Sequence, residues 1–340
     1  MTDKPSRLST TIDFAAEGKQ CDFVRIPHSV HRSAYGWLPM PICCIKNGDG
    51  PTVLLTSGTH GDEYEGQVAL TRLIREVEPD HIKGRLIISP MTNYPSAKAG
   101  LRTSPIDDLN LNRVYPGDPD GTVTLAIAHY VETVLMEMSD YVMDLHSGGS
   151  SLMYLASSIV PIGDGGADYQ KRLELAGAFG APISFVMPGG AATGTSSSGA
   201  ARKGLIGIGT EMGGSGTVTP DCLAICEDGV RRALGHLGVL TQGIPDAPAT
   251  PSRILRAPDF TYYAYASEDG LYEPLVELGD EVEAGQPAAL IHYPETPWRE
   301  PAQVNFEQAG LVVCKRIPGR TERGDCLFHL GRDVDPNSLE

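Results

Sequence analysis

Short apolar runs alternate with amphipathic stretches through the first two thirds of the chain. The runs at residues 52–56, 85–89 and 141–145 are rich in Val, Ile and Leu and end at Ser, Pro or His, which is typical of buried strands. Further strands are predicted at residues 183–187 and 205–209. Apolar residues at helical spacing predict helices at residues 66–76, 124–138, 169–179 and 223–234.

The remaining parts of this region carry weaker patterns. Residues 1–50 contain two strand signals, at 23–26 and 40–45, before a turn at Asn47. Residues 93–117 are dense in Asn, Arg, Asp and Pro, which favours an ordered loop over a helix or strand. Residues 189–204 are rich in Gly, Ala, Ser and Thr, and we expect a mobile loop there.

Strands that alternate with helices predict an α/β fold, with a mixed, largely parallel sheet flanked by helices. The composition changes at residues 243–251, which read as a linker. Beyond residue 253 the pattern consists of short strands and turns without a strong helix. We therefore expect two domains, an α/β domain over residues 1–248 and a small all-β, barrel-like domain over 253–335.

Charge and composition narrow the classes of function. The chain has 27 Lys and Arg against 43 Asp and Glu, a net charge of −16, which argues against nucleic acid or an anionic membrane as partner. No apolar run approaches the roughly 20 residues of a membrane span, and the first residues lack the apolar core of a signal peptide. Seven cysteines without a framework spacing favour reduced thiols and a cytoplasmic location. A homo-oligomer remains open.

Four residues able to support zinc chemistry follow predicted strands: His60, Glu63, His146 and Glu211. In a parallel sheet the carboxyl ends of the strands share one edge, where ligands bind. A catalytic zinc needs three protein ligands of the His and Glu type. Taken singly, His60 with Glu63 also fits a surface loop, and His146 also fits a core histidine.

Two arginines lie in the polar segment at residues 93–117. The guanidinium groups of Arg102 and Arg113 offer rigid, bidentate donors for a carboxylate or a developing oxyanion. They could equally hold the loop together through Asp107 and Asp108. The residues alone leave both readings open.

The motifs together carry a family resemblance. HGDE at 60–63, NLNRVYPG at 110–117, DLHSGG at 144–149 and TEMGG at 210–214 resemble the succinylglutamate desuccinylase/aspartoacylase family, within the zinc carboxypeptidase superfamily. The resemblance implies a zinc-dependent amidohydrolase that removes an acyl group from a small N-acyl amino acid. A zinc carboxypeptidase acting on peptides and a non-enzymatic binding module are the alternatives.

The resemblance also implies roles for individual residues. One zinc ion per subunit would be held by His60, Glu63 and His146. Glu211 would act as general base, and Arg102 would stabilise the oxyanion. Asn112 and Arg113 would bind the carboxylate of the amino acid. From its spacing, Asp144 is a candidate to orient His146, although it could instead cap a neighbouring loop.

Within the family, RTSPID at 102–107 followed by NLNRVYPG most resembles the branch that deacetylates N-alpha-acetyl-L-2,4-diaminobutyrate in ectoine breakdown. The products would be L-2,4-diaminobutyrate and acetate, and aspartoacylase or desuccinylase activity is the alternative. Asn110 replaces an Asp frequent in the family, and three more residues separate Arg102 from Asn112 than in aspartoacylases. Both departures concern the identity of the substrate rather than the metal.

Overall fold

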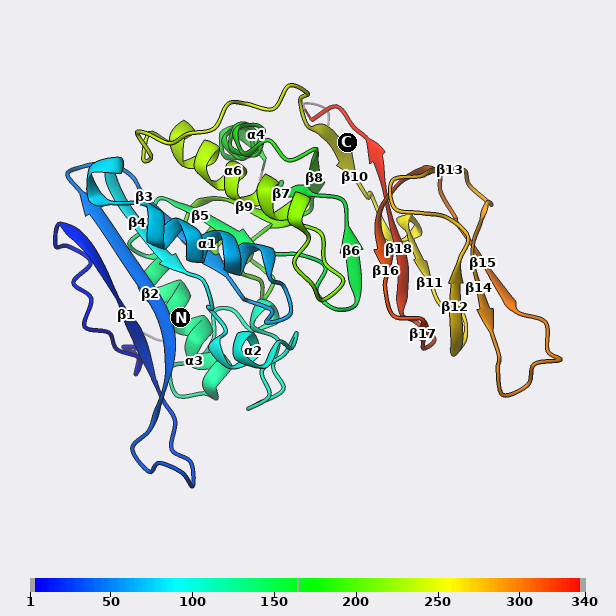
Figure 1. Cartoon of the computed structure of the whole chain (residues 1–340), viewed down its shortest axis with the longest axis horizontal. Coiled ribbons are helices and arrows are strands. Elements are labelled where there is room, and N and C mark those ends of the chain that lie inside the picture. Colours follow the sequence, from blue (N-terminus) through cyan, green and yellow to red (C-terminus); the bar gives the residue numbers. More distant parts are fainter. Residues whose placement is uncertain (1–3, 164, 337–340) are drawn as a thin grey trace.

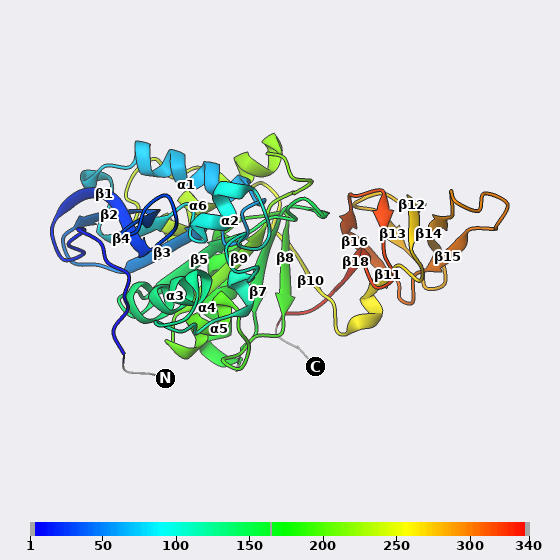
Figure 2. The same ribbon diagram turned by 90° about the horizontal axis from the view of Figure 1, so that it is seen from below.

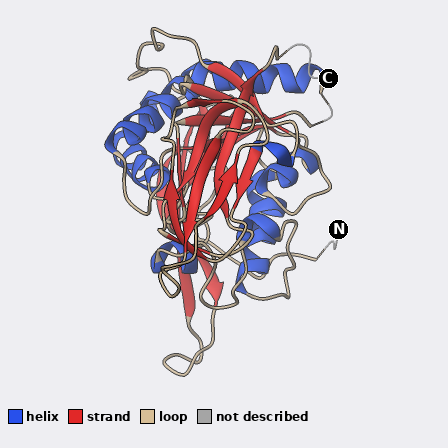
Figure 3. Ribbon diagram, turned by 90° about the vertical axis from the view of Figure 1, so that its right-hand side faces the viewer, coloured by secondary structure: helices blue, strands red, loops and turns tan. Residues whose placement is uncertain are grey.

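The computed structural model describes residues 4–163 and 165–336, which form a large mixed sheet with helices on both faces and a smaller sheet at one end (Figures 1 and 3). The large sheet has the strand order β1-β2-β4-β3-β5-β9-β7-β8-β10-β18-β16-β13, with β11 paired to β18 and β6 to β16. The strands of this sheet up to residue 211 are β1 (Gly18–Pro27), β2 (Trp37–Asn47), β3 (Thr52–Ser57), β4 (Gly84–Ser89), β5 (Tyr141–Leu145), β6 (Leu152–Tyr154), β7 (Ser157–Pro161), β8 (Ile183–Met187) and β9 (Ile206–Glu211).

The central strands β4, β3, β5 and β9 are parallel neighbours, as are β7, β8 and β10. Strand β7 runs antiparallel to β9, and the outer pairs β1–β2 and β2–β4 are antiparallel too. The mixed sheet predicted from the sequence is confirmed, with its parallel part in the middle.

The central strands are apolar on both faces because helices cover both. In β3, Val53 and Leu55 pack into one core and Leu54 into the opposite core, as the alternation of a strand requires. The first core lies under α1 (Glu65–Glu76), α4 (Gly166–Phe179) and α6 (Pro220–His236). The second lies under α3 (Val123–Tyr130), its π-helical continuation Val131–Met136, and α5 (Ser196–Arg202).

The C-terminal strands form the elongated end of the molecule (Figure 2). Four of them make a separate sheet in the order β15-β14-β12-β17, and the others extend the large sheet. A third apolar core fills the space among them. Their bounds are β10 (Arg253–Arg256), β11 (Tyr263–Tyr265), β12 (Gly270–Pro274), β13 (Glu281–Val282), β14 (Pro287–His292), β15 (Ala302–Asn305), β16 (Gly310–Arg316), β17 (Arg320–Thr321) and β18 (Cys326–Asp333).

Two predictions about loops are wrong in part. Residues 93–117 contain the helix α2 (Tyr94–Ala99), which begins with Pro95 in its first turn, and a 3₁₀ turn at Leu111–Arg113. Residues 189–204 contain α5, a seven-residue helix whose Thr195 side chain accepts a hydrogen bond from the backbone N–H of Ser198. Tertiary contacts, together with the Thr195 cap in α5, override a composition typical of loops.

Two further 3₁₀ turns of three residues each lie at Pro79–His81 and Phe260–Tyr262. Among the described residues, no helix combines the length and the apolar character that a bilayer crossing needs.

Candidate active site

The loop between β3 and α1 brings His60 and Glu63 to the carboxyl edge of the sheet. Gly58 has a φ of +64° in this loop, and a Cβ on Gly61 would lie 1.9 Å from the carbonyl oxygen of Ser96, so the chain turns tightly against α2. His60 and Glu63 are buried, at 3% exposure each. The loop therefore presents an imidazole and a carboxylate to the same point.

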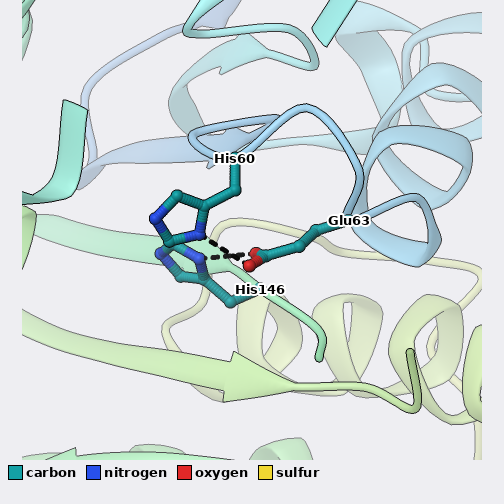
Figure 4. Close-up of side chains that lie close together, drawn as sticks. All are labelled: His60, Glu63 and His146. Atoms are coloured by element: carbon teal, nitrogen blue, oxygen red, sulfur yellow. Dashed lines mark hydrogen bonds and ion pairs between the residues drawn. The ribbon is translucent and has the colours of Figure 1, made fainter. Parts of the chain in front are cut away.

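His146 reaches that point from β5, the parallel neighbour of β3. Its Nδ1 lies 2.7 Å from Oε2 of Glu63, while Nδ1 of His60 lies 2.6 Å from Oε1 of the same carboxylate (Figure 4). The three ligand atoms all lie within 4.8 Å of one another. The structure thus brings together the three residues that the sequence predicted as ligands.

The outer nitrogens of both histidines are occupied by acceptors. Nε2 of His146 donates to Oδ2 of Asp144 at 2.9 Å, and Nε2 of His60 donates to Oδ1 of Asn110 at 3.1 Å. Oδ1 of Asn110 also accepts from the backbone N–H of Asn112, which fixes the orientation of its amide. Each imidazole thus directs its Nδ1 atom toward Glu63, the atom through which it would bind a metal ion.

Asp144 is held by a hydrogen-bond network of its own. Its Oδ1 accepts from the hydroxyls of Thr56, at 2.9 Å, and Thr59, at 3.1 Å, and its Oδ2 accepts from Ser196 of α5 at 2.6 Å. Although burial raises it, the pKa of Asp144 is lowered overall by His146 and these donors. Asp144 therefore contacts and orients His146, and the alternative of a simple loop cap is not what the contacts show.

Burial and neighbouring charges also shift the pKa values of Glu63 and His146. Burial alone would raise the pKa of Glu63, but His146 and His60 lower it to about 2. Burial likewise opposes protonation of His146, yet Asp144 and Glu63 hold its pKa well above the usual value. A buried pair of carboxylates that attracts positive charge so strongly is suited to a cation, and the His–Glu–His donor set fits zinc.

Glu211 ends β9, the next parallel strand after β5. Its Oε2 is buried and has no hydrogen-bond partner among the described residues. Burial raises the pKa of Glu211 well above its usual value, as does the charge of Glu63, while His146 and Arg102 act in the opposite direction. The carboxylate is close enough to the cluster to feel all three charges, and it is free to take part in proton transfer.

Arg102 and Arg113 approach the cluster from the segment after α2. Arg102 lies 3.5 Å from Oε1 of Glu63, with its side chain 46% exposed. Arg113 donates to the backbone oxygen of Asn112 and forms no ion pair with any residue that the structure describes. Burial lowers the pKa of Arg113, and so does the charge of Arg102. Two cations this close and incompletely paired form a site for an anion.

The alternative role for the two arginines is not supported. Asp107 instead accepts hydrogen bonds from the backbone N–H and the hydroxyl of Thr124, at 2.8 and 2.7 Å. Asn112 accepts from the backbone N–H of Ser196 through Oδ1, which leaves its side-chain NH₂ available to a ligand.

Sequence reasoning missed the contacts of Asn110 and Ser196. Asn110 was noted only as a departure from a family motif, whereas it contacts a candidate ligand across 50 positions of the chain. The NLNR motif was a signal for it. Ser196 lies in the stretch predicted as a mobile loop and offered no signal of its own.

A buried His–Glu–His cluster beside an unpaired carboxylate, at the carboxyl edge of a mixed α/β sheet, is a donor set that could hold a metal ion in a hydrolase. Residues 49–237 match the model of the succinylglutamate desuccinylase/aspartoacylase catalytic domain, and the chain belongs to that family. It is an enzyme that hydrolyses linear amide bonds.

Relatives cover almost the whole chain. The N-alpha-acetyl-L-2,4-diaminobutyric acid deacetylase of Halomonas elongata is 41% identical over 98% of this chain and 97% of that protein. The product-bound ectoine utilization protein EutE (DoeB) from Ruegeria pomeroyi superposes with a TM-score of 0.92 at 36% identity, covering 96% of this chain and 99% of that one. A succinylglutamate desuccinylase/aspartoacylase structure from Rhodobacter sphaeroides gives the same TM-score and identity, covering 97% and 100%.

Proposed function

We propose that the enzyme removes the acetyl group from N-alpha-acetyl-L-2,4-diaminobutyrate, releasing L-2,4-diaminobutyrate and acetate, and that it uses one zinc ion per subunit. The similarity to the Halomonas elongata deacetylase and to EutE supports this choice of substrate. The free thiols of all seven cysteines, each within the described residues, are consistent with a cytoplasmic location.

The observation that carries the proposal is that few cationic side chains are free to bind a carboxylate of the substrate. Arg113, with Asn112 beside it, offers one site for a carboxylate. Two further cations, at the end of the segment 189–204, are engaged in ion pairs: Arg202 pairs with Glu132 at 2.7 Å, and Lys203 pairs with Glu137 at 2.5 Å. Acetyl-aspartate and succinyl-glutamate carry additional carboxylates, and a desolvated carboxylate without a partner costs several kcal/mol.

His60, Glu63 and His146 would hold the zinc ion, which when bound activates a water molecule and polarises the acyl carbonyl. Glu211 takes a proton from the attacking water and later delivers it to the leaving amine, acting as general base and then as general acid. The charge that develops on the carbonyl oxygen is stabilised by Arg102.

Asn112 and Arg113 hold the α-carboxylate, which places the scissile amide against Glu211. The same donors would accept the terminal carboxylate of a peptide, so a carboxypeptidase is the competing activity.

A panel of substrates tests the proposal. With the purified zinc-loaded enzyme, we expect a higher kcat/KM for N-alpha-acetyl-L-2,4-diaminobutyrate than for N-acetyl-L-aspartate, N-succinyl-L-glutamate or a dipeptide with a free terminal carboxylate. Release of free amine is measured for all four. A higher kcat/KM for acetyl-aspartate would refute the choice of substrate and leave the zinc amidohydrolase intact, whereas preferred cleavage of the dipeptide would favour the carboxypeptidase.

A further inference from the structure

A cavity of about 100 Å³ adjoins Glu211 where the catalytic sheet meets the C-terminal strands. Tyr154 of β6, Phe185 of β8 and Glu211 of β9 form part of its wall, and Tyr263 of β11 and His329 of β18 come from beyond residue 253. The general base thus faces a chamber that the C-terminal strands help to enclose.

His329 is the unusual member of this wall. Its side chain is 4% exposed, its ring stacks on Tyr263 with centroids 4.1 Å apart and planes 9° apart, and Phe185 meets it edge-on at 4.8 Å. Neither ring nitrogen has a hydrogen-bond partner among the described residues. Burying an imidazole without hydrogen-bond partners costs free energy. Two free ring nitrogens beside a cavity therefore indicate a ligand that can form hydrogen bonds.

The protonation state of His329 determines which hydrogen bonds the ring can form. Burial lowers the pKa of His329 to about 3, so the ring is neutral at physiological pH. A neutral imidazole has one N–H donor and one lone pair. The lone pair can accept a hydrogen bond from a cationic donor, and the neutral ring does not repel a positive charge.

The other residues that line the cavity favour a ligand of one charge. Oε2 of Glu211 is buried and unpartnered, and no Lys or Arg of the described residues lines the cavity. The rings of Tyr154, Phe185 and Tyr263 present aromatic surface, which attracts cations. A carboxylate placed here would find no cation to pair with, whereas an ammonium group would find the unpartnered oxygen of Glu211 as an acceptor and aromatic rings.

We propose that this cavity receives the amine-bearing side chain of the substrate, with His329 accepting a hydrogen bond from the terminal ammonium group. The inference rests on the proposed function and adds to it the residues that recognise the side chain. A cavity of about 150 Å³ holds benzene, with six heavy atoms, so about 100 Å³ suits the three heavy atoms beyond Cα of diaminobutyrate. The C-terminal strands then determine specificity by contributing His329 and Tyr263.

A substitution that keeps the ring but removes the lone pair tests the inference. We compare wild type and His329→Phe on N-alpha-acetyl-L-2,4-diaminobutyrate and on N-alpha-acetyl-L-norvaline, which has a methyl group in place of the ammonium. In the variant, the ratio of kcat/KM for the first substrate over the second should fall roughly 10- to 100-fold, the scale of a hydrogen bond to a charged group. Calorimetry should show the same preferential loss of affinity for the product L-2,4-diaminobutyrate over norvaline.

His292→Phe is the matched control, since the side chain of His292 on β14 is 43% exposed and pairs with Glu273 at 2.5 Å, and His292 does not line the cavity. It should leave the ratio at the wild-type value. Tyr263→Leu provides a second variant should His329→Phe unfold, because loss of the stacked ring should also lower the ratio.

The two proposals fail in different ways. If wild type prefers the diaminobutyrate substrate but both folded cavity variants keep the wild-type ratio, the cavity holds only water or an apolar acyl group and the inference is overturned. If wild type itself prefers acetyl-aspartate, the proposed function fails, whatever the variants do.

Discussion

At the scale of single residues, the site depends on which nitrogen of each histidine is free. Asp144 and Asn110 occupy the outer nitrogens, so both Nδ1 atoms face Glu63. The sequence predicted His60, Glu63 and His146 because each follows a strand end in a compact motif. It could not predict the partner of His60, because that contact depends on how the segment after α2 folds back.

Loss of one candidate ligand should remove the metal. In His60→Ala or His146→Ala, two protein ligands remain, which hold zinc poorly, so zinc content and turnover should disappear together. Metal analysis of the purified variants measures this, with His236→Ala at the exposed end of α6 as the control. Near-stoichiometric zinc in either variant would exclude that residue from the ligands.

The role of Glu211 is separable from metal binding. Glu211→Gln keeps the size of the side chain and should retain zinc and the fold, while turnover falls at least about 10²-fold, the usual scale of general acid–base catalysis. Steady-state kinetics on metal-matched samples provide the measurement. Wild-type turnover would mean that another group transfers the proton.

The contact between Asn110 and His60 makes a finer prediction. Asn110→Ala removes the acceptor from Nε2 of His60, so zinc affinity should fall roughly 10- to 100-fold without loss of the fold. Asn110→Asp restores an acceptor and should recover most of the affinity. A competition titration with a zinc chelator compares the three proteins, and equal affinity in all of them would show that the hydrogen bond does not orient the ligand.

At the scale of elements, α5 shows why composition misled the prediction of a loop. Its Ser and Gly residues favour turns and outnumber its two Ala residues, which favour a helix, yet Thr195 caps the helix and Ser196 binds Asp144. At its other end, Arg202 pairs with Glu132, whose side chain is fully buried. These contacts join segments 52 and 70 positions apart, which no local pattern reveals.

The pair between Arg202 and Glu132 should therefore contribute strongly to stability. Arg202→Ala leaves the buried carboxylate of Glu132 uncompensated and should lower the free energy of unfolding by about 3–5 kcal/mol. Urea denaturation measures the change. Lys203→Ala is the matched control, since Glu137 is 62% exposed and that pair should contribute no more than about 1 kcal/mol. Equal effects of the two substitutions would contradict the prediction.

At the scale of the whole molecule, the α/β class followed from the alternation of strands and helices. The antiparallel insertion of β7 beside β9 did not, because strand order depends on pairings between distant segments. The boundary predicted near residue 248 lies in a stretch without regular structure. The hydrogen bonds of the large sheet nevertheless continue across it, because β10 pairs in parallel with β8 and antiparallel with β18.

We propose that residues 1–248 and 253–335 are distinct in topology but depend on each other for stability. A chain ending at residue 248 would leave the edge of β8 unpaired and expose Phe185, which is 3% exposed in the intact protein. It would also lack His329 and Tyr263 beside Glu211. We therefore expect this fragment to aggregate or to unfold at a much lower temperature than the full chain, and to lack deacetylase activity. Circular dichroism and size-exclusion chromatography of the fragment test this, and a monodisperse, active fragment would show that the catalytic part is complete without the C-terminal strands.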